Sequence, residues 1–324
     1  MFFRFLLALV LVLAALWGGG ALYYRAPLPG FANIALIAGF VGVLLVSAAL
    51  LLRRRRQGAA LLASLAALGA LGLWYGTIRP SDTLNWAPDV ARRSLVHIDG
   101  DVIRVRNLRN FDWQGENHGI ARWEERTYAL SQLQTLDIFL SYWSGPTIAH
   151  LITSFGFADD RQLAFSTEIR KQVGQDYDPL AGFFRSYTLA LIAAEESDVI
   201  KVRTNKRGED VFRYRLDLKP ETVRLLFADY AALTQKLEAQ PEFYNTILDN
   251  CSMVPFRMVR LRDPKAIPFD WRILTVGALP EYLLEQGFLD PSTPREGLRE
   301  RARITPKAIA AEQAPNFSAA IRAP

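Results

Sequence analysis

Residues 33–57 read NIALIAGFVGVLLVSAALLLRRRRQ. An uncharged apolar run from 33 to 52 is followed directly by the four arginines Arg53 to Arg56. About 20 apolar residues are what an α-helix needs to cross a hydrocarbon core of about 30 Å, where every backbone N–H and C=O must be bonded within the helix. The stretch therefore predicts a transmembrane helix that ends in a basic loop.

Two further apolar runs flank this one, so we predict three transmembrane helices over about 5–24, 33–52 and 58–77. The first 81 residues contain no Asp, Glu or Lys. A cleaved signal peptide is the other interpretation of the first run, because an early arginine followed by leucine-rich sequence is typical of one. That run is longer than an ordinary signal core, and two more spans follow it. We therefore assign residues 1–80 to a membrane anchor.

The arginines also predict the orientation of the anchor. Short basic loops are retained in the cytoplasm, which places Arg53 to Arg56 and the N-terminus there. The third span then leaves the membrane on the outer side. Everything after about residue 80 is expected in the periplasm, and a bacterial inner (plasma) membrane is the simplest host.

The charge of the chain argues against a nucleic-acid partner. The formal net charge is +5, but six of the 38 basic residues lie before residue 57, and the other 32 nearly balance the 33 acidic residues. The folded part is therefore close to neutral and lacks the basic surface that a polyanion needs. Membrane lipids are the expected partners, together with a lipoprotein or another cell-envelope substrate.

The chain beyond the anchor predicts one α+β domain over 81–299. Alternating apolar and polar residues indicate strands, and apolar residues at helical spacing after Lys219-Pro220 indicate a helix to about 238. We expect further helices near residue 250 and over 279–287. The predicted strands cover 101–108, 125–142, 148–157, 161–170, 186–203 with a break at Glu195–Ser197, and 210–218.

The last residues and the missing motifs complete this outline. From residue 300 the periodicity is lost and Ala, Pro and Arg accumulate, so 300–324 is predicted to be a flexible tail. The sequence contains no glycine-rich phosphate loop and no metal-ligand spacing, and we expect neither a cofactor nor a metal. Glu195-Glu196 is interpreted as a solvated corner.

Cys251 is the single cysteine, so no internal disulfide can form. A lone extracytoplasmic thiol is either a small buried core residue or a reactive nucleophile. Of the three histidines, His97 and His118 lie in polar, loop-like sequence, whereas His150 opens an apolar strand, where an imidazole needs a partner. His150 is therefore the candidate partner of Cys251.

A hairpin over 150–170 predicts a carboxylate for His150. If Phe157 pairs with Arg161, His150 faces Glu168 on the neighbouring strand, and directly paired side chains share one face. Glu168 could then orient the imidazole and fix its tautomer. A register slip of one residue would offer Thr167 or Ile169 instead. Ser166 is the next candidate if Glu168 is not the orienting residue.

The sequence around Cys251 predicts a position at a helix start. Asp249 and Asn250 are good capping residues and precede an apolar run, which is compatible with Pro255 only if that proline lies in the first turn. The helix dipole and free N–H groups there favour a thiolate and can contribute to an oxyanion hole. A cysteine at a helix start with a histidine on a strand is the papain-like arrangement, here in permuted order because the histidine comes first.

Seven short motifs, spread in this order over about 95–290, carry a family resemblance. They are Tyr142-Trp143, Ala149-His150, Ser166-Thr-Glu168-Ile-Arg170, Arg203-Thr-Asn205, Tyr244-Asn245, Asn250-Cys251 and Asp270-Trp271-Arg272. Together they resemble the Lnb N-terminal periplasmic domain family. The chain departs from the family pattern at Ser252-Met253, where the family has threonines, and in its three anchor helices.

The resemblance implies a papain-like thiol fold of the permuted NlpC type, with His150 and Cys251 at the family's histidine and cysteine positions. Members similar to Lnb transfer an acyl chain within bacterial lipoproteins. The resemblance assigns no chemistry to Arg203-Thr-Asn205, which is more often a structural turn.

The leading hypothesis is a membrane-anchored periplasmic thiol acyltransferase or hydrolase. Cys251 would attack a carbonyl, His150 would transfer the proton, and Glu168 would orient His150. The alternative is a membrane-tethered binding or assembly module of the cell envelope without catalysis. For the enzyme, we expect a groove around Cys251 that is lined by apolar side chains and opens toward the membrane.

Reporter fusions test the predicted orientation. A reporter fused after residue 57 should read as cytoplasmic, and one fused after residue 324 should read as periplasmic, because the arginine cluster is retained inside. The measurement is alkaline phosphatase activity against fluorescence of a cytoplasmic reporter at both positions. The opposite pattern would overturn the orientation and place Cys251 in a reducing compartment.

Overall fold

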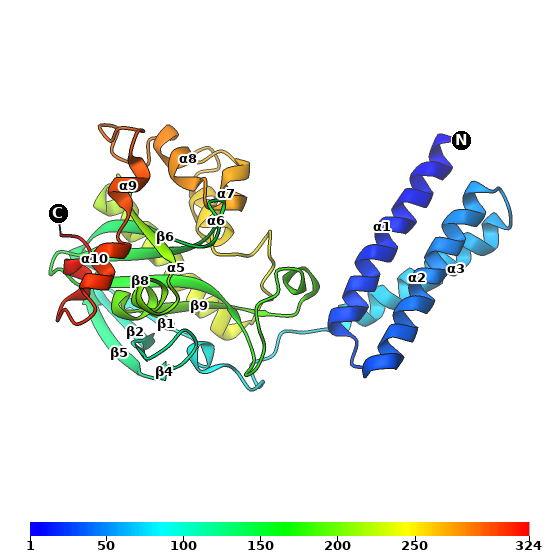
Figure 1. The fold of residues 1–324 in the computed structure, drawn as a ribbon, viewed down its shortest axis with the longest axis horizontal. Helices are drawn as coiled ribbons and strands as arrows, with labels where there is room; N and C mark the ends of the chain where they lie inside the picture. Colours follow the sequence, from blue (N-terminus) through cyan, green and yellow to red (C-terminus); the bar gives the residue numbers. More distant parts are fainter. Residues whose placement is uncertain (324) are drawn as a thin grey trace. The chain divides into compact units, whose positions relative to one another are not determined.

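The structure is a computed structural model that describes residues 1–323. Clustering of the backbone divides it into two compact units. The first unit comprises Met1–Ser81 and Tyr177–Tyr187, and the second comprises Asp82–Asp176 and the chain from Thr188 onward. Figure 1 shows the elements of both units.

The first unit contains three helices: α1 (Phe2–Arg25), α2 (Gly30–Leu52) and α3 (Gln57–Thr77). Each helix is long and apolar enough to cross a membrane. The three predicted spans are therefore confirmed, with bounds that differ by at most three residues. The apolar side chains outside the contacts between the helices are exposed, as a lipid environment requires.

Small residues allow these helices to approach one another. A Cβ atom on Gly18 of α1 would lie 2.4 Å from the ring of Phe40 in α2 and 2.8 Å from Leu71 in α3. Such distances are far below van der Waals contact, so a larger residue at this position would displace the Phe40 ring and Leu71. Ala8, Leu11 and Ala15 of α1 continue the same contact toward the N-terminus.

The segment Tyr177–Tyr187 belongs to the membrane unit, although it lies between two strands of the second unit. The Tyr24 hydroxyl of α1 donates a hydrogen bond of 2.7 Å to Asp178. The Tyr24 ring stacks on Phe184 with 5.3 Å between the centroids. The sequence gives no sign of this association, because the contact partners are 154 residues apart.

One large sheet forms the centre of the second unit. Its order is β1-β2-β9-β8-β7-β6-β10, and β5 also pairs with β2. All neighbours are antiparallel except β2 and β9, which meet at one parallel pair. The strands are β1 (Leu95–Asp99), β2 (Val102–Arg109), β5 (Trp123–Ala129), β6 (Leu133–Ser144), β7 (Ile148–Phe157), β8 (Gln162–Arg170), β9 (Thr188–Ala194) and β10 (Asp210–Arg215), and the small hairpin is β3 (Asp112–Trp113) with β4 (Gly119–Ile120).

Alternating side chains give this sheet two apolar faces. In β6, Ile138 and Leu140 belong to one buried cluster and Phe139 to the other. We name the faces after the helices on them. The α6 face carries α5 (Pro220–Ala239), α6 (Met253–Arg262), α7 (Trp271–Thr275), α8 (Leu279–Glu285) and α9 (Leu298–Ala302), and the α10 face carries α4 (Glu196–Val199), a π-helical turn (Val202–Lys206), α10 (Thr305–Ala310) and α11 (Phe317–Ala320).

Aromatic side chains fix α5 on the α6 face. Phe227 and Tyr230 lie against Phe155 of β7, with ring centroids 5.1 and 5.4 Å apart. Phe165 of β8 completes the group at 5.0 Å from Tyr230. Such edge-to-face contacts stabilise a core beyond the burial of area alone. They hold α5 across the two central strands, as its apolar spacing predicts.

The sequence predicts most of these elements, but the strand expected over 186–203 ends early. The chain leaves the sheet after Ala194 and enters α4. Asp198 is fully buried and accepts hydrogen bonds from Arg109, the Trp113 indole and the Phe111 backbone N–H. A buried carboxylate needs such donors, and a strand that continued past Ala194 would not bring Asp198 to them. The solvated corner at Glu195-Glu196 is wrong for Glu196, which is also fully buried.

The predicted flexible tail over 300–324 is also wrong. The described residues of this segment form α10 and α11 and continue from α9. Ile304, Ala308, Phe317 and Ile321 are buried in the cluster on the α10 face. The few apolar residues are spread over an Ala-, Pro- and Arg-rich sequence, so no periodicity shows, yet each fills a place on the sheet.

Arg322 ties the C-terminal segment to the sheet. Its guanidinium donates to Glu196 at 2.6 Å and to Asp137 at 2.8 Å. Both carboxylates are fully buried. Asp137 also pairs with Arg213 and Arg215, whereas Glu196 has only the Ser154 hydroxyl besides Arg322 among the described residues.

We expect Arg322→Met to lower the free energy of unfolding by about 3 kcal/mol, because it leaves the buried Glu196 carboxylate without its cation. Adding Glu196→Gln should recover part of this loss, since a neutral amide needs no counter-charge. Arg104→Met removes an exposed arginine of β2 and is the matched control. Chemical denaturation of the detergent-solubilised protein measures these differences. Equal unfolding of Arg322→Met and the wild type would contradict the assignment.

Candidate functional site

The central strands β7 and β8 separate before they end. Their register pairs Ile152 with Ser166 and Gly156 with Gln162, which confirms the predicted hairpin register. The ladder stops at Ile152, although β7 remains paired with β6 as far as Ile148 and β8 with β9 as far as Arg170. The sheet therefore has an opening between two of its inner strands, and His150 and Glu168 lie beside it.

His150 and Glu168 lie on the α10 face, joined by Ser166. The His150 Nε2 atom is 2.7 Å from the Ser166 Oγ atom, and that hydroxyl donates to the Glu168 Oε1 atom at 2.6 Å. The direct distance from Nε2 to Oε1 is 3.5 Å. The structure thus brings the predicted pair together and adds Ser166 as the link between them.

These hydrogen bonds fix the tautomer of His150. A carboxylate only accepts hydrogen bonds, so the Ser166 hydroxyl must give its one proton to Glu168. The Ser166 oxygen can then only accept from the imidazole, which places a proton on Nε2. The other ring nitrogen, Nδ1, is left for the thiol. A histidine held in this tautomer keeps one ring nitrogen able to accept a proton.

Arg203 is a member of the site that the sequence reasoning missed. It lies in the π-helical turn Val202–Lys206, and its guanidinium donates to Glu168 at 3.0 Å. A second nitrogen donates to the Val199 carbonyl at 2.9 Å, and Glu209 lies 3.9 Å away. The side chain is 5% exposed. The apolar residues shortly before Arg203 in the sequence could have suggested that it is buried, but not which carboxylate it contacts.

Cys251 lies in a turn immediately before α6. The Asn250 side chain caps this turn, since its Oδ1 atom accepts from the backbone N–H of Met253 at 2.8 Å and of Ser252 at 3.1 Å. Pro255 is the third residue of α6 and so lies in the first turn, as predicted. Because Asn250 occupies the N–H groups of Ser252 and Met253, these two groups cannot serve as the predicted oxyanion donors.

The Cys251 side chain reaches the sheet from the α6 face. It packs against the apolar cluster that includes Ala149 and Leu151 of β7. The backbone N–H of Leu151, which has no partner in β8, donates to the thiol, and the thiol also interacts with the His150 imidazole. The cysteine from one face and the histidine from the other therefore meet at the opening between β7 and β8.

The charges at the site favour an ion pair. Burial lowers the pKa of His150, but the negative charge of Glu168 outweighs it and raises that pKa to about 9. Burial raises the pKa of Cys251, yet the charge and hydrogen bond of His150 bring it below its ordinary value. The pKa of Glu168 also lies well below its ordinary value, because the charge of His150 outweighs burial. The arrangement favours a thiolate beside an imidazolium.

The other predicted candidates lie elsewhere. His97 is on β1, a strand and not the expected loop, and His118 follows β3 in the small hairpin. Both are exposed, and neither takes part in the contacts around Cys251. Among the described residues no group of His, Cys, Asp and Glu could hold a metal ion.

The pH dependence of thiol alkylation tests the ion pair. The thiolate forms as the pH rises through the lowered pKa of Cys251, so labelling should begin at a lower pH than the value of about 8.5 for a free cysteine. The imidazolium is lost as the pH rises through about 9. Glu168→Gln should lower the pH at which the imidazolium is lost, because it removes the charge that raises the His150 pKa.

His150→Ala is the decisive variant in this measurement, and Ser166→Thr, which keeps the hydroxyl, is its control. His150→Ala should shift the labelling midpoint to higher pH, because the charge and the hydrogen bond of the imidazole no longer lower the pKa of the thiol. Iodoacetamide labelling rates on membranes give the midpoints. The same midpoint in His150→Ala and the wild type would contradict the pairing.

The comparison with known families now identifies the domain. Residues 120–277 match the family model described as the Lnb N-terminal periplasmic domain, and this range includes His150, Glu168, Arg203 and Cys251. No curated protein and no solved structure matches the chain. Together with the three apolar helices, the match indicates a membrane-anchored protein with a periplasmic domain. Over residues 120–277 the chain thus matches, as its motifs predicted, the Lnb N-terminal periplasmic domain family.

Proposed function

We propose that this chain is a periplasmic thiol acyltransferase or hydrolase, anchored in a bacterial inner membrane and acting through Cys251 and His150. The observation that carries the proposal is the meeting of the two side chains at the opening between β7 and β8, where the pKa of the thiol is lowered and that of the imidazole is raised. A cysteine that served only as a core residue would need neither a charged histidine nor the Ser166, Glu168 and Arg203 contacts behind it.

The first half of the reaction forms a thioester. The Cys251 thiolate attacks a carbonyl carbon, and the imidazolium at Nδ1 gives its proton to the leaving group as the bond to that group breaks. Glu168 holds the imidazole through Ser166 and stabilises its charge, and Arg203 keeps Glu168 in place. Glu168 is thus a positioning residue, because it acts on substrate only through His150.

The second half returns the enzyme to its starting state. Neutral His150 accepts a proton from a nucleophile, which attacks the thioester and takes the acyl group while the thiolate leaves. Water as the nucleophile makes the chain a hydrolase, and an amine or hydroxyl group makes it an acyltransferase. Both outcomes use the same residues, so the acceptor and not the dyad distinguishes them.

Apolar surroundings favour an acyl chain as the transferred group. The turn that precedes Cys251 exposes Ile247 and Leu248, with 44% and 58% of their surfaces accessible. Phe269 is also exposed and lies against Phe256 of α6. These side chains would contact an apolar substrate near the thiol. A lipoprotein acyl group, which the family resemblance suggests, fits this chemistry better than a polar peptide.

Trapping the acyl-enzyme tests the proposal. Incubation of the solubilised protein with a medium-chain nitrophenyl ester should add the mass of the acyl group to Cys251, and hydroxylamine should remove it, because a thioester forms. Cys251→Ala should abolish the adduct and His150→Ala should slow its formation by about 10²-fold or more. Glu168→Gln should fold and reduce the rate less than loss of Cys251 does.

Acetyl and medium-chain esters compared in the same assay test the acyl preference. The longer chain should react faster if Ile247 and Leu248 contact it, and Leu248→Ser should reduce that difference while the acetyl ester is unaffected. An adduct at neither chain length, with a normally titrating Cys251, would overturn the enzyme and favour a catalytically inactive binding or assembly module. Full activity in Glu168→Ala would remove Glu168 from the site.

A further inference from the structure

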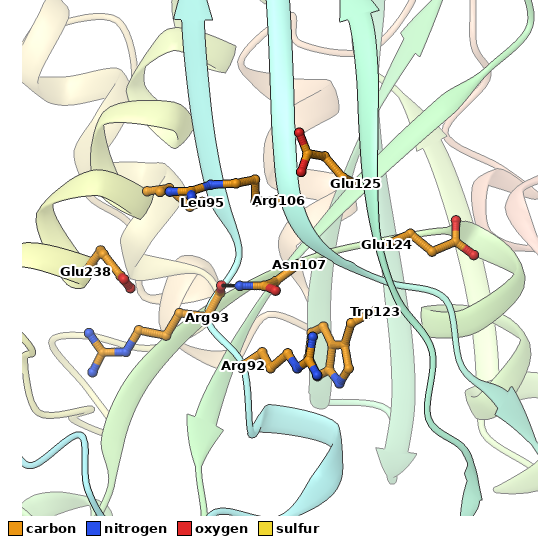
Figure 2. Close-up of a pocket in the computed structure, with 9 residues that line it drawn as sticks. All are labelled: Arg92, Arg93, Leu95, Arg106, Asn107, Trp123, Glu124, Glu125 and Glu238. Atoms are coloured by element: carbon orange, nitrogen blue, oxygen red, sulfur yellow. Dashed lines mark hydrogen bonds between the residues drawn. The ribbon is translucent and has the colours of Figure 1, made fainter.

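A cavity of about 350 Å³ lies in the second unit and shares no residue with the Cys251 site. Figure 2 shows Glu238 and Arg93 on one side of it and Trp123 and Glu124 on the other. Its volume is at the lower end of the range of about 300–1,000 Å³ that is typical of small-ligand pockets. The lining residues are Arg92, Arg93, Leu95, Arg106, Asn107, Trp123, Glu124, Glu125 and Glu238.

A β-bulge in β2 shapes one wall of this cavity. The pairing of β2 with β5 shifts between Val105 and Leu108, and Asn107 adopts a left-handed backbone with φ of 54°. The Asn107 side chain donates to the Arg93 backbone carbonyl at 2.8 Å. The backbone carbonyl of Asn107 accepts from the Ser94 hydroxyl at 3.0 Å. Bulges redirect neighbouring side chains and are common next to binding sites. Arg106 and Asn107, the two residues within this shift, both line the cavity.

Two of the charged residues are already neutralised by other parts of the domain. Arg93 is buried, pairs with Asp82 and donates to the Leu237 carbonyl. Glu124 accepts from the Asn110 amide at 2.9 Å and from Arg126 at 2.8 Å. These two side chains form walls of the cavity, and a ligand would pair with the other charged groups that line it.

Four charged side chains remain available. Arg92, Arg106, Glu125 and Glu238 are exposed, and within residues 1–323 none of them has a hydrogen bond or an ion pair through its side chain. Two positive and two negative charges in one cavity sum to zero. A polyanion such as a phosphate ester would meet the two carboxylates, so the charge pattern fits a ligand that carries both signs.

Trp123 adds an apolar wall that is held in place. Its ring contacts Phe111 edge-on, with 5.3 Å between the centroids, and part of it packs against the buried cluster around Phe111. The remaining surface faces the cavity. A fixed aromatic ring can pack against a side chain without loss of its own conformational freedom.

We infer that this cavity binds a short zwitterionic peptide. The peptide carboxylate pairs with the guanidinium groups of Arg92 and Arg106, which suit a carboxylate better than an ammonium side chain would. The peptide ammonium pairs with Glu125 and Glu238, and a side chain of the peptide packs on Trp123. The inference does not depend on the proposed thiol chemistry, because none of these residues contacts Cys251.

Binding of alanyl-tyrosyl-alanine to the full chain in detergent tests the site. We expect measurable affinity by calorimetry, and about tenfold or greater loss with the N-acetyl or the C-amide form, because each lacks one charged contact. Arg106→Gln should weaken the free peptide by a similar factor and leave the C-amide form unaffected. The double variant Glu125→Gln with Glu238→Gln should weaken binding of the free peptide by a similar factor and leave binding of the N-acetyl form unaffected.

Two controls separate this site from the rest of the molecule. Arg122→Gln removes an exposed arginine outside the cavity and should bind like the wild type. Cys251→Ala should also bind normally, so failure of the thiol chemistry would not affect the result. Equal affinity for the free, acetylated and amidated peptides, or no difference between Arg106→Gln and Arg122→Gln, would overturn the inference.

Discussion

The site depends on the end of the β7–β8 ladder. An unbroken sheet would keep the two faces apart, because strand side chains point alternately to opposite sides. His150 points to the α10 face, whereas Cys251 arrives from the α6 face. Beyond Ile152 the pairs between β7 and β8 are missing, which leaves an opening in the sheet and the Leu151 backbone N–H without a partner in β8. The Cys251 thiol accepts a hydrogen bond from this N–H. The loss of a few ladder hydrogen bonds is thus the condition for the contact between Cys251 and His150.

The α10 face supplies the electrostatic support for this arrangement. A buried carboxylate is unfavourable without donors, and a buried imidazolium is unfavourable without a counter-charge. Glu168 meets both needs, because it accepts from Ser166 and Arg203 and faces His150. The same logic operates at Asp198 and at Glu196, which are buried and satisfied by cations and hydroxyls from distant segments. Buried carboxylates organise this domain as much as its apolar clusters do.

Sequence reasoning predicted what is local and missed what is distant. The three spans follow from composition, and the position of Glu168 follows from a tight hairpin at Ala158-Asp159-Asp160. The capped turn at Asn250 follows from one side chain and the next three residues. Arg203 and Arg322 could not be found in this way, because their partners lie 35 and 126 residues away. Glu196 was predicted to be solvated because the segments that bury it, including the one that carries Arg322, are distant in the sequence.

The association of Tyr177–Tyr187 with the membrane helices has a consequence for how the protein can be divided. The segment joins β8, which carries Glu168, to β9, so the chain passes from the sheet into the other unit and back again. A soluble fragment that starts after Ser81 would retain Leu180 and Phe184 without the helices that Phe184 contacts. The boundary between anchor and periplasmic domain is thus crossed three times, and a single cut does not separate them.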